Sequence, residues 1–248
     1  MQVVRSLAED VWKSFVHQQP RGNIFQTPEM FQVFARAKGH RPELWAVTGS
    51  RGEVLALFTP VFVTLFNGLL RRLTTRAVAY GGVLCSDSVD GRAALRLLLD
   101  TYAREAGRDS LFTELRHLHE ASPLQPVLAE CGFAYEEHLN YLIDFDRPAE
   151  VVLQSIGPRT RKKIRRALRS GRVHISEVGD RARLDEWYAT LQETYDNARV
   201  PLADRSMFEA AFELLLPKHM AKFLLAEVDG VAVACSIELQ HKDTIYGW

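Results

Sequence analysis

The stretch that decides the fold is SIGPRTRKKIRRALRSGRV, residues 155–173. Eight lysines or arginines and no acidic residue fall within residues 159–172. Ser155 offers an N-terminal cap, Pro158 suits a first helical turn, and Gly171 provides a stop. The segment therefore predicts a strongly basic helix.

Two opposed stripes run along this expected helix. One is apolar and follows the i, i+3, i+4, i+7 spacing, and the other is cationic and lies two positions out of phase. Two positions are about 200° around a helix, so we expect the apolar stripe to dock on the protein and the cationic stripe to be exposed. The stripes are Ile164, Ala167, Leu168 and Gly171, and Lys162, Arg165, Arg166 and Arg169.

A dense arginine stripe suits a ligand that carries phosphate, because the planar guanidinium grips phosphate through two hydrogen bonds. Candidate ligands are a nucleotide-sugar diphosphate, coenzyme A, the acceptor stem of a transfer RNA, and anionic lipid headgroups. The alternative is a solvated face whose cations pair with neighbouring acids. The residues predicted to bind substrate here are Arg161, Lys162, Arg165 and Arg166.

Composition bounds the other interpretations. The 248 residues carry 31 basic and 31 acidic side chains, so no net field attracts nucleic acid, and we expect no DNA partner. Three cysteines outside any C-x-x-C spacing argue against a disulfide framework or a zinc site and favour the cytoplasm. We also expect no signal peptide and no membrane span.

Apolar periodicity elsewhere predicts alternating helices and strands, an α/β (α+β) fold. The expected helices are Glu29–Lys38, Asp90–Ala106, Pro123–Cys131, Arg183–Asn197 and Arg205–Leu216. The expected strands are Leu44–Thr48, Val54–Val63, Ala77–Leu84, Leu111–Leu118, Leu139–Phe145, Val173–Val178, Phe223–Val228, Val231–Leu239 and Thr244–Trp248. We expect the first three strands to form an antiparallel meander and Asp229-Gly230 to form a tight hairpin turn.

The pattern restarts after Arg147-Pro148, which predicts two domains, 1–147 and 148–248. Gly52 and Gly230 each separate a strand from a longer strand, so we interpret them as equivalent turns of a weak internal duplication. The sequence stops at Trp248 within an expected strand, which indicates that the second domain is truncated.

The basic segment resembles that of FemAB-like proteins, in which a short lead-in precedes an Arg/Lys-rich helix, a glycine and a strand. Other motifs of that family occur in the same order and together cover nearly the whole chain. They are Asn23–Pro28, Ala79–Val83, Glu114–Arg116, Trp187–Pro201 followed by Phe208, and the final hairpin ending in Ile245–Trp248.

The resemblance implies two tandem GNAT-like acyltransferase domains that move an acyl or aminoacyl group to an amine of a peptidoglycan or exopolysaccharide precursor. It implies acyl-CoA or aminoacyl-tRNA as donor, no tightly bound cofactor, a phosphate-bearing envelope precursor as partner, and peripheral contact with the inner membrane face. One departure is Phe34, where peptidoglycan-type members carry a lysine that holds precursor phosphates; Arg36 and Lys38 lie on other helical faces.

The same resemblance singles out two further groups in the first half. Tyr80, Gly81 and Gly82 follow a strand, and paired glycines let a backbone approach a ligand or form a bulge. Glu114 and Arg116 share one face of a strand, where they either grip a polar substrate or pair with each other.

Tyr195, Tyr246 and Trp248 are candidates for an acceptor cleft, because aromatic rings stack on sugars; the alternative is a place in the core. His117 and His119 are interpreted as surface histidines rather than metal ligands. No residue stands out as the catalytic base. Two alternatives stay open: an acetyl-CoA-dependent GNAT enzyme with another acceptor, and a module that binds RNA or an anionic surface without catalysis.

Overall fold

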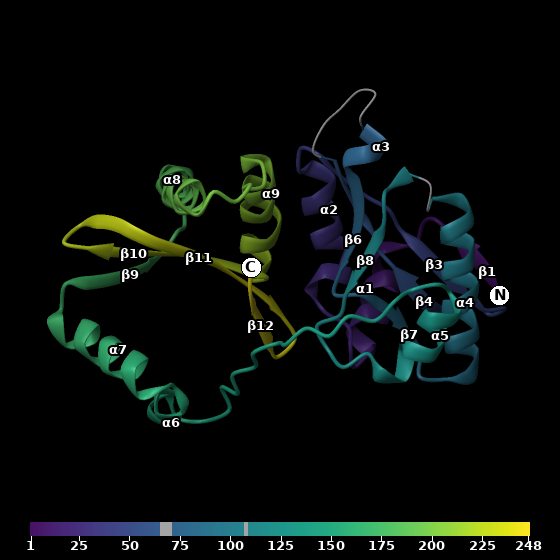
Figure 1. Ribbon diagram of the computed structural model, residues 1–248, viewed down its shortest axis with the longest axis horizontal. Coiled ribbons are helices and arrows are strands. Elements are labelled where there is room, and N and C mark those ends of the chain that lie inside the picture. Colours follow the sequence, from purple (N-terminus) through teal and green to yellow (C-terminus); the bar gives the residue numbers. More distant parts are fainter. Residues whose placement is uncertain (65–70, 107–108) are drawn as a thin grey trace. The chain divides into compact units, whose positions relative to one another are not determined.

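The computed structural model describes residues 1–64, 71–106 and 109–248. They form two compact units that are not contiguous in sequence (Figure 1). The helix α9, Arg205–Leu215, belongs to the first unit although it follows residue 147. The first unit comprises Met1–Glu136, Ala203–Ala221 and Gln240–Ile245, and the second comprises Glu137–Leu202, Lys222–Leu239 and Tyr246–Trp248.

Two four-stranded sheets organise the first unit, in the orders β1-β3-β4-β7 and β2-β5-β6-β8. Its strands are β1 Gln2–Val4, β2 His40–Pro42, β3 Trp45–Thr48, β4 Val54–Phe58, β5 Val61–Thr64, β6 Thr75–Tyr80, β7 Val83–Cys85 and β8 Thr113–Arg116. Its helices, besides α9, are α1 Glu9–Gln18, η1 Ile24–Gln26, α2 Pro28–Arg36, α3 Arg71–Thr74, α4 Val89–Glu105, η4 Ser122–Leu124, α5 Gln125–Glu130 and η5 Leu216–Lys218.

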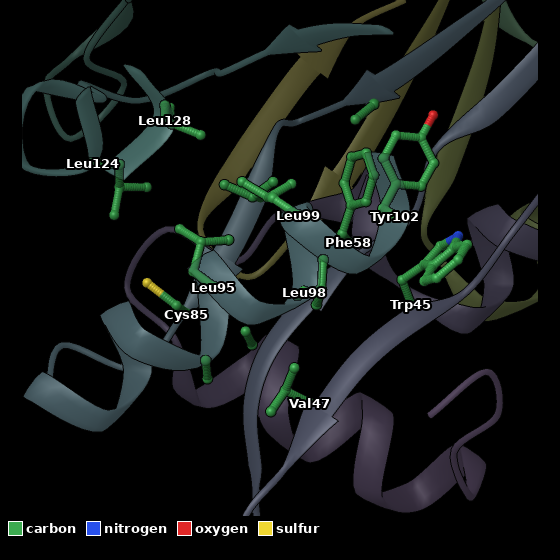
Figure 2. Packing of buried hydrophobic residues seen from close by; sticks show 14 of the residues in the cluster. Trp45, Val47, Phe58, Cys85, Leu95, Leu98, Leu99, Tyr102, Leu124 and Leu128 are labelled. Atoms are coloured by element: carbon green, nitrogen blue, oxygen red, sulfur yellow. The ribbon is translucent and has the colours of Figure 1, made fainter. Parts of the chain in front are cut away.

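The sheet β1-β3-β4-β7 is covered on both faces because its strands alternate apolar side chains between them. Trp45 and Phe58 point toward α4, where both rings meet Tyr102 edge-on at 5.4 and 4.8 Å (Figure 2). Ala46 and Leu57, their neighbours in sequence, point to the opposite face and pack with α1. This double burial makes the sheet the centre of the unit.

The meander prediction is wrong in part, because two of the predicted runs each break into two strands. Thr59-Pro60 ends β4 and starts β5, and Gly81-Gly82 separates β6 from β7. Proline has no N–H for a sheet ladder, and both glycines adopt positive φ, so each pair turns the chain. Each predicted run therefore supplies one strand to each of the two sheets.

Helix α2 is capped by Thr27, whose hydroxyl accepts the N–H of Met30, and it packs against α9. The Lys38 N–H also donates to Ser206 Oγ at 2.8 Å, just after the start of α9. The predicted helices at these two positions are confirmed, and α9 completes the first unit from far along the chain.

Most of the sheet β12-β11-β10-β9 belongs to the second unit, whereas the ends of β11 and β12 at the turn between them belong to the first. Asp229 and Gly230 have φ of 53° and 81°, the left-handed pair that a type I′ hairpin needs, so the predicted turn is confirmed. The elements of this half are α6 Ala149–Ser155, α7 Pro158–Ser170, β9 Val173–Glu177, α8 Arg181–Ala198, β10 Ala221–Val228, β11 Val231–His241 and β12 Thr244–Gly247.

Helix α8 covers one face of this sheet. Trp187 is fully buried, meets Phe223 edge-on at 5.0 Å, and donates its indole N–H to the carbonyl of Ser236. In the register of β9 and β10, Ile175 lies opposite Ala226, away from the buried Phe223 face, and it is 62% exposed. The second unit thus buries one side of its sheet more fully than the other.

Two further predictions in this half are wrong. Ser155 is the last residue of the unforeseen helix α6, and the residue that precedes α7 is Gly157, which makes no side-chain cap. The segment Leu139–Phe145 forms no strand, and its apolar side chains are exposed, Tyr141 by 92%. None of the described helices is long and apolar enough to cross a membrane.

Candidate functional site

The first group of predicted site residues lies at the ends of the parallel strands β6 and β8. The register places Tyr80 beside Arg116 and Val78 beside Glu114. Arg116 donates two hydrogen bonds to Glu114, at 2.7 and 3.1 Å, and its guanidinium carbon lies 5.5 Å from the centre of the Tyr80 ring. The mutual ion pair considered from the sequence is therefore formed.

Tyr80 lies on an aromatic stack that includes the residue at the family's lysine position. Its ring is 5.2 Å from that of Phe34, nearly parallel, and 5.7 Å from that of Phe25. Phe34 is 2% exposed, so this position supports Tyr80 from within the core. Arg36 and Lys38 instead pair with Glu213 and Asp204, at 3.4 and 3.9 Å.

The Gly81-Gly82 turn is held by the Asn23–Pro28 motif. Asn23 and Gln26 form a reciprocal capping box on η1, and both donate side-chain hydrogen bonds to the Gly81 carbonyl, at 3.3 and 3.1 Å. A Cβ on Gly81 would lie 2.2 Å from Asn23 Oδ1. Two motifs that were separate in the sequence are thus one structural unit; the N-x-x-Q spacing of a capping box was the overlooked signal.

His117 packs against the same turn and is not the surface residue expected from sequence. A Cβ on Gly82 would lie 2.3 Å from its ring, and burial lowers the pKa of its imidazole. Its Nε2 is buried and has no hydrogen-bond partner among the described residues. Within the described ranges, no group of three or more His, Cys, Asp or Glu side chains is placed to hold a metal ion.

Helix α7 holds the second group of predicted residues. It begins after Gly157, has proline at its first turn, and ends at Gly171, whose φ is 65°. Arg165 pairs with Glu150 of α6, and Arg161 donates to the Gln154 carbonyl at 2.8 Å. Two of the four predicted phosphate ligands therefore contact α6.

The remaining cations of α7 form one exposed stripe. Their spacing, with offsets of 0, 3, 4, 7 and 10 residues, places them on one helical face. None of them forms an ion pair with any described residue, so neighbouring acids do not neutralise this face. The stripe, which includes two residues not singled out from sequence, Arg159 and Lys163, consists of Arg159, Lys162, Lys163, Arg166 and Arg169.

The apolar stripe of α7 is less buried than predicted. No residue of α7 is buried, and Leu168 is 71% exposed. Ile164 and Ala167 are half-buried. The prediction of a docked apolar face is therefore wrong for Leu168.

The predicted aromatic residues are half-buried members of the second unit. Tyr195 lies in α8, and Tyr246 and Trp248 lie two residues apart at the end of the chain, where strand alternation gives them the same face. Trp248 donates its backbone N–H to Ile237 of β11 at 3.0 Å. Tyr80 and α7 belong to different units, so a cleft shared by the two predicted groups stays a prediction.

Comparison with known proteins identifies the architecture. Residues 158–248 match the family model of the acetyltransferase (GNAT) domain, which begins at the first residue of α7. The sequence matches no curated protein.

Solved structures agree with that assignment. FemX has a TM-score of 0.63 at 20% identity; the match covers 92% of this chain and 58% of FemX. A tandem GNAT protein from the clavulanic acid biosynthesis pathway has a TM-score of 0.51 at 13% identity, covering 98% of this chain and 75% of that one. A glucosamine N-acetyltransferase region of a fungal multi-domain β-N-acetylglucosaminidase has a TM-score of 0.50 at 14% identity. The match covers 96% of this chain and 27% of that one.

These similarities establish the fold. The chain has the mixed α/β architecture of tandem GNAT proteins, and the resemblance to FemAB-like proteins is confirmed at that level. It spans 58% of the length of FemX.

Proposed function

We propose that the protein is an N-acyltransferase that moves an acyl group from acyl-CoA to an amine of a phosphate-bearing cell-envelope precursor in the cytoplasm. The observation that carries the proposal is the GNAT domain match at residues 158–248, which opens with the free cationic stripe of α7. The GNAT match supports acyl-CoA as donor and adds no support for aminoacyl-tRNA.

The chemistry needs positioning more than covalent help. The amine nitrogen attacks the thioester carbonyl carbon, a C–N bond forms, and the C–S bond breaks. The amine loses one proton and the thiolate of coenzyme A gains one, so coenzyme A leaves as its thiol. Holding donor and acceptor in register supplies much of the rate enhancement, because it removes the entropy cost of their encounter. The α7 stripe would hold phosphates of donor or acceptor.

The proposal names the acceptor only by its chemical class. The FemX fold supports a peptidoglycan precursor, whereas the buried Phe34 removes the lysine expected on α2 for such a ligand. The similarity to a glucosamine N-acetyltransferase region supports an amino sugar. We therefore propose an envelope amine, either on a peptide stem or on an amino sugar of a polysaccharide precursor.

A thiol-release assay tests the proposal. The chain is mixed with acetyl-CoA and a phosphate-bearing acceptor, either nucleoside-diphosphate glucosamine or a lysine-containing stem peptide linked to a nucleoside diphosphate sugar, and the released thiol is measured together with the mass of the acceptor. We expect acetylated acceptor in step with released thiol. Absence of transfer to every amine tested, by a chain shown to be folded, would contradict the proposal.

A charge-matched pair of variants tests the role of α7. Lys162→Ala with Arg166→Ala removes two cations from the free stripe, and we expect KM for acetyl-CoA or for the phosphorylated acceptor to rise about tenfold. Arg51→Ala with Lys222→Ala removes the same two residue types from exposed positions outside α7 and is expected to leave KM unchanged.

The free stripe also supports a second function, the binding of RNA or an anionic surface without catalysis. Counterion release then predicts that affinity for RNA falls steeply and log-linearly with salt concentration. A steep salt dependence in a chain that transfers no acyl group would favour this second function.

A further inference from the structure

A cavity of about 540 Å³ lies wholly within the first unit, and neither α7 nor Tyr80 lines it. It is formed by α1, the start of α2, the segment around η5, and the turn between β11 and β12. Glu29 is the single acid among the described residues that line it. Its lysines and histidines are Lys13, His17, Lys218, His219, His241 and Lys242.

Glu29 forms ion pairs with two lysine ammonium groups at this cavity. Its carboxylate is 8% exposed and lies 2.8 Å from Lys13 Nζ and 2.9 Å from Lys218 Nζ. Burial raises the pKa of Glu29, but the hydrogen bonds from both lysines outweigh that effect and hold its pKa below the usual value. One carboxylate thus holds two cations in place, and Lys13 is also paired with Glu9 of α1 at 2.5 Å.

Lys242 adds a cation whose side chain hydrogen-bonds a backbone carbonyl rather than a carboxylate. Its Nζ donates to the Gln19 carbonyl at 2.7 Å, and it forms no ion pair with the described residues. Lys242 and His219 both adopt left-handed backbone conformations, with φ of 54° and 56°, which are unfavourable for residues with a Cβ. Backbone strain of this kind tends to persist at binding sites.

The imidazoles supply an unused hydrogen-bonding group. The rings of His17 and His241 meet edge-on, with centres 6.4 Å apart. His241 Nε2 is buried and has no partner among the described residues. Leaving a buried polar atom unpaired costs about 1–3 kcal/mol, which a ligand with hydrogen-bonding oxygens would offset.

We propose that this cavity binds a phosphorylated small molecule, with its phosphate oxygens at Lys242, Lys218 and the His17–His241 pair. Lys13 is paired with both Glu9 and Glu29, which leaves Lys218 and Lys242 as the ammonium groups for a phosphate. The volume exceeds what inorganic phosphate needs and lies within the range of ordinary small-molecule sites. No residue of α7 lines the cavity, so the inference goes beyond the proposed function and stands without acyl transfer.

Calorimetric titration of the full chain with inorganic pyrophosphate, at fixed ionic strength and pH 7, tests the site. Lys242→Asn removes the charge while tolerating the left-handed backbone, and we expect at least about tenfold weaker binding. Lys242→Arg keeps the charge and should bind within about threefold of the native chain. Lys222→Asn is the control, because it removes an exposed lysine outside the cavity and should bind as the native chain does.

A second readout locates the ligand. Pyrophosphate should shift the side-chain nitrogen resonances of His17 and His241 in NMR spectra, and those of His174 in the second unit should not move. Failure of the native chain to bind pyrophosphate, or equal binding by Lys242→Asn, would overturn the proposal. A chain that binds pyrophosphate but acylates no amine would refute the proposed function alone.

Two further binding experiments distinguish a soluble phosphorylated ligand from a lipid-linked one. Tighter binding of a sugar nucleoside diphosphate than of pyrophosphate would support a soluble ligand. Sedimentation with phosphatidylglycerol vesicles that depends on Lys242 would support a lipid-linked one.

Discussion

In the first unit, the sheet β1-β3-β4-β7 is packed between α4 and α1, whereas α8 covers one face of the sheet in the second unit. Both sheets alternate apolar residues along their strands. Val47 is fully buried, while Val233 is 53% exposed. The difference shows that the alternation of apolar residues specifies a strand and its two faces. Which of those faces is buried depends on the helices that pack against the sheet.

Introducing a charge on each sheet gives the largest expected contrast. Val47→Asp places a carboxylate between β3 and α4, and we expect a loss of more than about 4 kcal/mol, enough to unfold the first unit. Val233→Asp should change the unfolding free energy by less than about 0.5 kcal/mol. Chemical denaturation followed by circular dichroism measures both, and equal losses would remove the contrast between the two sheets.

Removing the central ring of the second unit tests whether the units are independent. Trp187→Ala deletes the ring against Phe223 and should cost about 3–5 kcal/mol. Hydrogen exchange should show loss of protection in β9 and β10 with protection kept in α4. Simultaneous loss in both units would show that they unfold together.

A pair of glycines separates backbone strain from close packing. Gly81 and Gly132 have φ of 82° and 85°, but an added Cβ clashes with Asn23 only at Gly81. We expect Gly132→Ala to cost about 1–2 kcal/mol and Gly81→Ala about 1–2 kcal/mol more. Thermal unfolding measures the difference, and equal losses would mean that Asn23 moves aside freely.

Acid should weaken the first unit through Glu29. Because its folded-state pKa is depressed, its stabilisation is present above the unfolded value of about 4.3 and is lost as pH falls through the folded pKa. Glu29→Gln should therefore cost about 1–3 kcal/mol at pH 7 and progressively less below pH 4. Melting temperatures across this pH range measure the effect.

The control for this pH experiment is the exposed Glu193. Glu193→Gln should alter stability by less than about 0.5 kcal/mol at every pH. A pH-independent loss in Glu29→Gln would show that the ion pairs of Glu29 with Lys13 and Lys218 do not contribute.

Local signals in the sequence were sufficient for several elements. Asp229-Gly230 specifies its turn by backbone chemistry alone, and Pro158 and Gly171 bound α7 correctly. The segment Leu139–Phe145 shows the limit of that approach, because strand composition without a pairing partner in the described structure gave no strand. Pairing is a tertiary property that propensity does not contain.

The candidate site was predictable as separate pieces and not as an arrangement. The sequence identified Tyr80-Gly81-Gly82 and the motif at Asn23–Pro28, but nothing local shows that Gln26 hydrogen-bonds the Gly81 carbonyl. Likewise, the sequence identified the eight cations of the basic segment. The ion pair between Arg165 and Glu150 could not be predicted, because Glu150 lies on a helix that was not expected from the sequence.

The discontinuous first unit has a consequence for folding on the ribosome. Residues 1–136 emerge first, yet α2 finds its partner α9 only when residues 205–215 have been made, and Lys242 reaches the Gln19 carbonyl across 223 positions. Domains generally fold as units during synthesis, and long-range closure slows folding. The side of α2 that packs against α9 therefore has no partner until residues 205–215 have been synthesised.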